Sequence, residues 1–69
     1  TIDLLFMDSS HSNEQCRLEY QLFRPKMNSG GIILVDDLWW TPEFWREIPE
    51  EKLVLDGLHP NSGFGVIFT

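Results

Sequence analysis

Three carboxylates follow two short apolar runs. Asp8 follows the run at residues 2–7, and Asp36 and Asp37 follow the run at residues 31–35. Such runs are typical of strands in parallel sheets, which bind ligands outside their carboxyl ends. Neighbouring strand ends lie about 5–10 Å apart, so the carboxylates would repel one another unless a cation sat among them. Mg²⁺ is the first candidate, with Mn²⁺ or Ca²⁺ as alternatives. The simplest alternative is that these aspartates only end strands and cap loops.

Two further groups near these carboxylates could take part in chemistry. His11 lies three residues after Asp8, and its ordinary pKa suits a general base, a substrate contact or a metal ligand. An exposed histidine that caps the following helix is an equally open interpretation. Trp39 and Trp40 follow the acidic pair and could wall a pocket or stack on a substrate. The structural alternative places one of them beneath the next helix and the other at a subunit contact.

A helix is expected between the two apolar runs. Ser12 is a suitable N-cap, and Gln15 three residues later completes a capping box. Pro25 should end the regular helix near Phe23 or Arg24, and "NSGG" at residues 28–31 predicts a turn. The expected apolar stripe consists of Cys16, Tyr20, Phe23 and Met27, widened by Leu18 and Leu22.

The second half of the chain predicts a short helix and two strands. Thr41 and Pro42 are an N-cap and first-turn pair, so "PEFWREI" should be helical. Residues 52–55 and 63–69 are typical of an antiparallel hairpin. With the βαβ unit before it, residues 1–69 form one partial α/β domain. One crossover helix covers one face of a sheet, so we expect further helices and strands N-terminal to Thr1.

Composition and charge narrow the classes of partner. The 69 residues are 42% hydrophobic, which is too apolar for a disordered tail, and carry a net charge of -6. That charge argues against nucleic acid and anionic membranes as partners. The apolar runs fall far short of the roughly 20 residues that span a bilayer. A single cysteine, Cys16, forms no internal disulfide, which fits the reducing cytoplasm. A site rich in carboxylates favours cations as ligands instead.

Three segments together resemble the C-terminal half of a class I S-adenosylmethionine-dependent methyltransferase. They are "IDLLFMDSSHSNE", "MNSGGIILVDD" and "GFGVIF". In that family a strand ends in "DGDHSYE", a helix and a "KPGG" turn follow, the next strand ends in an acidic pair, and a hairpin closes a Rossmann-like sheet. The small-molecule and sugar O-methyltransferases look most similar. The resemblance spans nearly the whole chain.

The resemblance implies roles for the residues at the strand ends. Asp8 and the pair Asp36–Asp37 would bind Mg²⁺, His11 would be the catalytic base or a substrate contact, and Asp8 with Ser9 would contact S-adenosylmethionine. The metal would position a substrate hydroxyl for attack on the methyl group.

The chain also departs from the family pattern. The Gly-rich loop and the ribose-binding acid of the family are absent from these residues, so the chain alone should bind no cofactor and have no activity. Asn13 replaces the tyrosine of "HSYE".

Two other functions remain open on the sequence. The aromatic residues from Trp39 to Trp45 would suit a non-catalytic methyltransferase-like module that serves in binding or assembly, with a homo-oligomer as one form. A metal-dependent phosphatase or phosphoacceptor domain shares the strand-end aspartate. It would also need an Asp-x-Asp motif or a lysine-bearing strand end, and this sequence shows neither.

Overall fold

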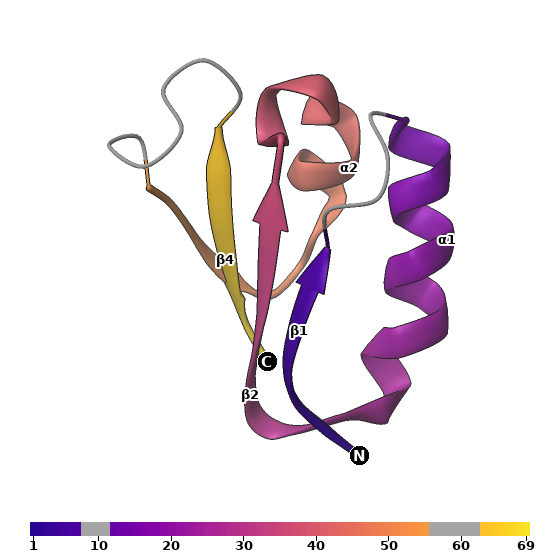
Figure 1. The fold of residues 1–69 in the computed structure, drawn as a ribbon, viewed down its shortest axis with the longest axis vertical. Helices are drawn as coiled ribbons and strands as arrows, with labels where there is room; N and C mark the ends of the chain where they lie inside the picture. The colour runs from indigo at the N-terminus through magenta and orange to yellow at the C-terminus, as the bar shows by residue number, and fades with distance from the viewer. Residues whose placement is uncertain (8–11, 56–62) are drawn as a thin grey trace.

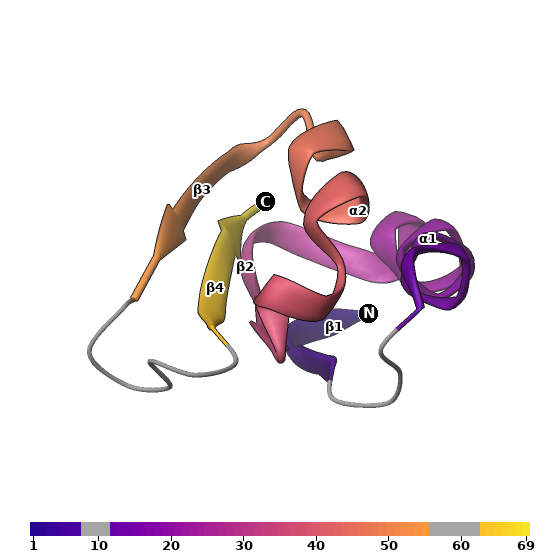
Figure 2. The same ribbon diagram turned by 90° about the horizontal axis from the view of Figure 1, so that it is seen from above.

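The chain forms a four-stranded mixed sheet with helices on one side (Figures 1 and 2). The computed structural model describes residues 1–7, 12–55 and 63–69. The strands are β1 (Ile2–Met7), β2 (Met27–Asp36), β3 (Glu51–Val54) and β4 (Phe64–Phe68). Their order is β1-β2-β4-β3, with β1 parallel to β2 and β4 antiparallel to both of its neighbours. The predicted βαβ unit and hairpin are confirmed, as is the α/β class with an incomplete Rossmann-like sheet.

Within the described residues, two α-helices and two short 3₁₀ turns lie between the strands. They are α1 (Asn13–Phe23), η1 (Arg24–Lys26), η2 (Leu38–Trp40) and α2 (Pro42–Glu47). Figure 2 shows α1 and α2 on the same side of the sheet. In the part of the chain that the structure describes, neither helix has the length or the apolar character to cross a membrane.

The start and end of α1 follow the sequence signals, but its apolar stripe is narrower than predicted. The Ser12 hydroxyl accepts a hydrogen bond from the Gln15 backbone N–H at 3.3 Å, and the helix ends at Phe23, two residues before the proline. Leu18 and Leu22 are exposed, so their assignment to the core stripe was wrong. They point away from the sheet because α1 packs chiefly through the side that carries Cys16 and Tyr20.

The turn predicted at residues 28–31 is instead an irregular part of β2. Between the pairs Ile2–Met27 and Leu4–Ile32, two steps along β1 correspond to five along β2, so β2 bulges there. Gly30 adopts a φ of 83°, which glycine tolerates readily. The glycine-rich stretch does bend the chain, but the bend lies inside the strand.

The core lies between the sheet and the helices. Ile33 and Val35 of β2 are fully buried against Phe44 of α2 and its surroundings. Trp45 lies over Gly65 of β4, where a Cβ atom would come within 2.7 Å of the indole ring. Glycine at this position therefore lets α2 approach the sheet closely.

The opposite side of the sheet carries apolar side chains and no helix among the described residues, and we call it the open face. Cross-strand register places the side chains of neighbouring strands in rows on this side. The Phe6 and Phe64 rings meet there with centroids 6.2 Å apart. The apolar residues of the open face are Leu4, Phe6, Ile32, Leu34, Leu53, Phe64, Val66 and Phe68.

Candidate functional site

The carboxyl ends of β1 and β2 lie at one edge of the sheet. Met7 pairs with Val35, so the two parallel strands end at the same level (Figure 1). Asp36 is the last residue of β2, and Asp37 follows it in the left-handed conformation, with a φ of 55°. This edge is where open α/β sheets bind ligands, so the structure places the acidic pair in the predicted position.

Asp36 and Asp37 form a tight local turn. The Asp37 backbone N–H donates a hydrogen bond of 2.9 Å to Oδ1 of Asp36. This contact explains how a non-glycine residue holds a positive φ, because aspartate side chains stabilise such turns through local hydrogen bonds. It also orients one oxygen of Asp36 toward the backbone of the next residue.

Several predicted site residues lie outside the described residues. These are Asp8, Ser9 and His11. Among the described residues, no group of three or more His, Cys, Asp or Glu side chains gathers as a metal site. The metal triad, the catalytic base and the cofactor contacts therefore stay predictions.

The residue that follows the acidic pair, Leu38, belongs to the hydrophobic core. The Leu38 backbone N–H donates to the Gly63 carbonyl at 3.2 Å, and the Leu38 side chain is fully buried. Trp39 is 48% exposed and Trp40 is 56% exposed, so the alternative that one of them packs beneath α2 is wrong. Leu38 takes that buried position. Both tryptophans lie in η2, which follows the acidic pair directly, and an exposed aromatic in such a segment is suited to contact a substrate.

Gly63 supports one side of Trp39. A Cβ atom at Gly63 would come within 2.8 Å of the Trp39 ring, and Gly63 itself has a φ of 82°. Because the glycine backbone packs closely against the indole, it holds Trp39 near the carboxyl ends of the strands. No signal in the sequence alone indicates this contact, because the two residues lie far apart along the chain.

The N-terminus of α2 is capped by a residue from α1. Oδ1 of Asn13 accepts a hydrogen bond of 2.8 Å from the Phe44 backbone N–H. The predicted cap, Thr41, occupies the N-cap position without a side-chain cap, and its buried Oγ1 makes no hydrogen bond of ordinary geometry. The prediction that Thr41 caps this helix was therefore wrong, although Pro42 does open it. This hydrogen bond links the start of α1, which follows β1, to the start of α2, which follows β2.

Cys16 is buried beneath this junction. Burial raises the pKa of its thiol, the Glu19 carboxylate raises that pKa further, and the nearby Thr41 hydroxyl lowers it by a smaller effect. A buried thiol with a raised pKa is a poor nucleophile, so Cys16 has a packing role, as predicted from its place on the helix stripe.

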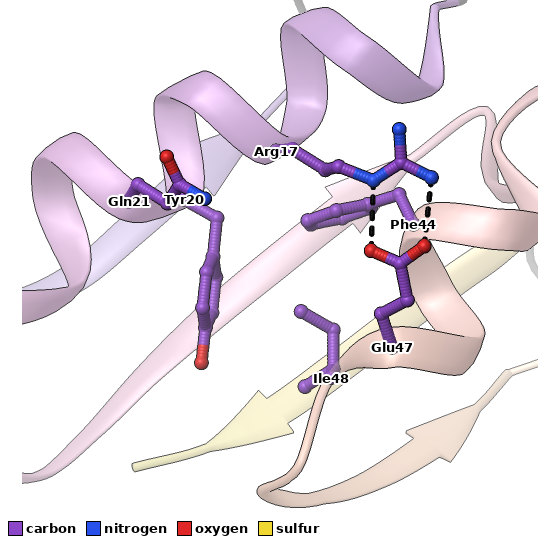
Figure 3. A pocket seen from close by; sticks show the side chains of 6 residues that line it. All are labelled: Arg17, Tyr20, Gln21, Phe44, Glu47 and Ile48. Carbon is purple, nitrogen blue, oxygen red and sulfur yellow. Dashed lines mark hydrogen bonds and ion pairs between the residues drawn. The ribbon is translucent and has the colours of Figure 1, made fainter.

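A cavity of about 160 Å³ lies between α1 and α2, away from the acidic pair (Figure 3). Its floor is formed by Phe44 and Ile48, and its rim includes Arg17, whose guanidinium donates two hydrogen bonds of 2.7 Å to Glu47. Arg17 holds the pKa of the Glu47 carboxyl below its usual value. The charged groups of Arg17 and Glu47 at the rim therefore pair with one another. The cavity lies between the two helices and is separate from the acidic pair at the strand ends.

A second cluster of polar side chains links α1 and η1 to the segment between α2 and β3. The Tyr20 hydroxyl donates to Glu50, and Nε of Arg24 donates to the same carboxylate at 2.6 Å. Burial and the Glu50 carboxylate together raise the pKa of Tyr20 to about 12. Burial by itself would raise the pKa of Glu50, but the hydrogen bonds from Tyr20 and Arg24 outweigh it, and the pKa is lowered.

Comparison with known protein families gives one match. The family model for the methyltransferase domain matches residues 1–38. This range contains β1, α1, β2 and the acidic pair, and it ends at buried Leu38. Comparisons with curated proteins and with solved structures find no match.

Proposed function

Because this chain belongs to the methyltransferase domain family, we propose that it forms the part of such a domain that receives the substrate in S-adenosylmethionine-dependent methyl transfer. The family match supports methyl transfer in general and the use of an S-adenosylmethionine-type cofactor. The acceptor that we propose is a hydroxyl of a small molecule or a sugar. The observation that supports this most directly is the position of the acidic pair at the carboxyl ends of β1 and β2, inside the matched range.

The exposed indoles and the predicted residues after β1 would have different roles in binding and catalysis. Trp39 and Trp40 would stack on the acceptor and shield it from water, because each already presents about half of its surface at this edge. Asp8 and Ser9 would contact the cofactor, and His11 would take the proton of the acceptor hydroxyl. The chain would work in the cytoplasm within a complete methyltransferase domain.

The acidic pair has the chemistry of a Mg²⁺ site. Two adjacent carboxylates fit the oxygen preference of this ion, which commonly takes one or two protein carboxylates and keeps several waters. Asp36 and Asp37, with Asp8, would hold it. When bound, the ion would lower the pKa of the acceptor hydroxyl and orient it.

Calorimetry on a complete methyltransferase domain that contains this sequence tests the proposal. We expect S-adenosylmethionine to bind the complete domain and not the 69 residues alone. Absence of cofactor binding by the complete domain would contradict the assignment. The metal is tested separately with an Asp36→Ala/Asp37→Ala double variant: unchanged activity with intact cofactor binding would eliminate the ion and leave methyl transfer standing.

A second candidate is a methyltransferase-like module that binds or assembles without catalysis. The exposure of both Trp39 and Trp40 favours it, because exposed tryptophans also occur at protein interfaces. Under this function the complete domain would bind no cofactor, and Trp40→Ala would weaken association with a partner. Cofactor binding with turnover would rule it out.

A further inference from the structure

Helix α2 is too short to be stable without support from other parts of the chain. It has 6 residues, whereas isolated helices shorter than about 12–15 residues are marginal in water. It directly follows η2, the turn that carries Trp39 and Trp40, so the placement of both indoles depends on how α2 is held. The hydrogen bond from the Phe44 N–H to Asn13 supports the first turn of α2. A different side chain supports its last turn.

Lys52 of β3 supports the C-terminal end of α2. The register pairs Lys52 with the fully buried Ile67, so its side chain stands on the helix side of the sheet. Its Nζ donates hydrogen bonds of 2.7 Å to the Trp45 carbonyl and 2.8 Å to the Ile48 carbonyl. The last carbonyls of a helix lack partners within the helix, and a charged donor binds them more strongly than a neutral one. The same ammonium lies 5.5 Å from the centre of the Trp45 ring, which packs on Gly65 of β4.

A continuous series of hydrogen bonds runs from Lys52 to the residue before β4. The Trp45 carbonyl accepts from Lys52, and the Trp45 N–H donates to the Thr41 carbonyl at 3.1 Å. The Thr41 N–H donates to the Leu38 carbonyl at 3.0 Å. The Leu38 N–H in turn donates to the Gly63 carbonyl at 3.2 Å. The segment formed by η2 and α2 is therefore tied to β3 at one end and to the start of β4 at the other.

From these contacts we propose that Lys52 is a positioning residue, which acts through α2 to set the placement of Trp39 and Trp40. Trp39 packs against Gly63, the last residue of the hydrogen-bonded series, so a shift of α2 is transmitted to its indole. Trp40 lies in the same turn and moves with it. A methyl acceptor on these indoles rests on the function proposed above, whereas their placement by Lys52 does not.

NMR on an isotope-labelled, complete methyltransferase domain that contains this sequence tests the proposal. Lys52→Met keeps a long unbranched side chain and removes the ammonium. We expect the indole N–H resonances of Trp39 and Trp40 to shift in this variant. The Thr41 amide should exchange with solvent roughly tenfold faster, because the series loses the charged donor at its end. Lys52→Arg supplies donors for both carbonyls and should keep the wild-type resonances.

Lys26→Met is the matched control. The Lys26 ammonium also lies over an aromatic ring, 5.8 Å from the centre of Phe23, but it belongs to η1. The variant loses the same charge as Lys52→Met and leaves the hydrogen bonds at the end of α2 in place. We expect the indole resonances of Trp39 and Trp40 to stay at their wild-type positions.

Three results would overturn the proposal. A folded Lys52→Met variant with unchanged Trp39 and Trp40 resonances would show that Lys52 only ends the helix. Equal shifts in Lys26→Met and Lys52→Met would assign the effect to the lost charge, and Lys52→Arg shifts as large as those of Lys52→Met would rule out the hydrogen bonds as the cause. Circular dichroism shows which variants fold, and Lys52→Gln, a shorter uncharged side chain, takes the place of Lys52→Met if that variant does not.

The proposed function is tested separately on the same proteins. Calorimetry measures S-adenosylmethionine binding by the complete wild-type domain. Absence of binding would contradict methyl transfer and leave the NMR result for Lys52 intact, whereas binding with unchanged indole resonances in Lys52→Met would overturn only the role of Lys52.

Discussion

Replacing Asn13 should destabilise a helix that is distant from it in sequence. Asn13→Ala removes the acceptor for the Phe44 backbone N–H, a hydrogen bond of 2.8 Å that is partly buried. Loss of an N-cap costs about 1 kcal/mol, and a buried N–H left without a partner costs about 1–3 kcal/mol. We expect a loss of roughly 1–2 kcal/mol, with a fall in Tm of about 4–8 °C for each kcal/mol.

Thr41 supplies the comparison that makes this prediction sharp. Sequence signals name Thr41 as the cap, whereas its buried hydroxyl makes no ordinary hydrogen bond in the structure. Thr41→Val should therefore be neutral or mildly stabilising, because it removes a buried polar group that lacks such a bond. Asn13→Asp keeps the acceptor and should stay within about 0.5 kcal/mol of the wild type.

Urea unfolding at one fixed protein concentration measures all three variants, since association would otherwise add to apparent stability. A Thr41→Val variant less stable than Asn13→Ala would refute the assignment of the cap to Asn13. Loss of α2 can be followed separately by hydrogen exchange at the Phe44 amide, which should accelerate in Asn13→Ala and not in Thr41→Val.

Three further predictions concern single side chains. Tyr20 is the one tyrosine of the chain, so the absorbance of tyrosinate follows this residue alone, and we expect a titration midpoint near 12 that is lower in Glu50→Gln. The contribution of the Tyr20–Glu50 contact to stability should be complete below about pH 10 and be lost as the pH rises toward 12. A midpoint near 10 in the folded protein would be inconsistent with this contact. The lowered pKa of Glu47 means that its pair with Arg17 stabilises the protein fully above the ordinary glutamate pKa, and that this contribution is lost as the pH falls through the lowered pKa. NMR titration should show the Glu47 pKa rising in Arg17→Gln, and an unchanged pKa would disprove that Arg17 is the cause of the lowering. Leu38→Ala should cost about 2–5 kcal/mol of unfolding free energy, because it opens a cavity at a fully buried site, and a cost as small as that of a surface substitution would show that the site collapses.

Much of the fold follows from signals carried within short segments. The β-branched run before Asp36, the Ser12 cap and the proline after Phe23 each fix a local structure, and the structure shows all three. The position of the acidic pair follows as well, because parallel strands joined by one helix must end at the same edge of the sheet.

Features that depend on contacts between distant segments could not be predicted in this way. The cap from Asn13 to Phe44 needs α1 and α2 to be placed relative to one another, and a threonine before a proline gives a stronger local signal. Leu18 fits a helical apolar stripe equally well whether it faces the sheet or water, since periodicity defines a face and not its direction. The support of Trp39 by Gly63 likewise arises only when the strand ends are assembled.

The acidic pair lies between the open face and the side of the sheet that the helices cover. The register with Phe64 places Asp36 in the last row of the open face, whereas Asp37 leads directly into buried Leu38 on the helix side. Whatever covers the open face therefore borders the Asp36 carboxylate and removes water from one side of it. Electrostatic attraction between a carboxylate and a cation strengthens as water is excluded. At the Mg²⁺ site proposed above, a covered open face would therefore strengthen the attraction between the Asp36 carboxylate and the ion.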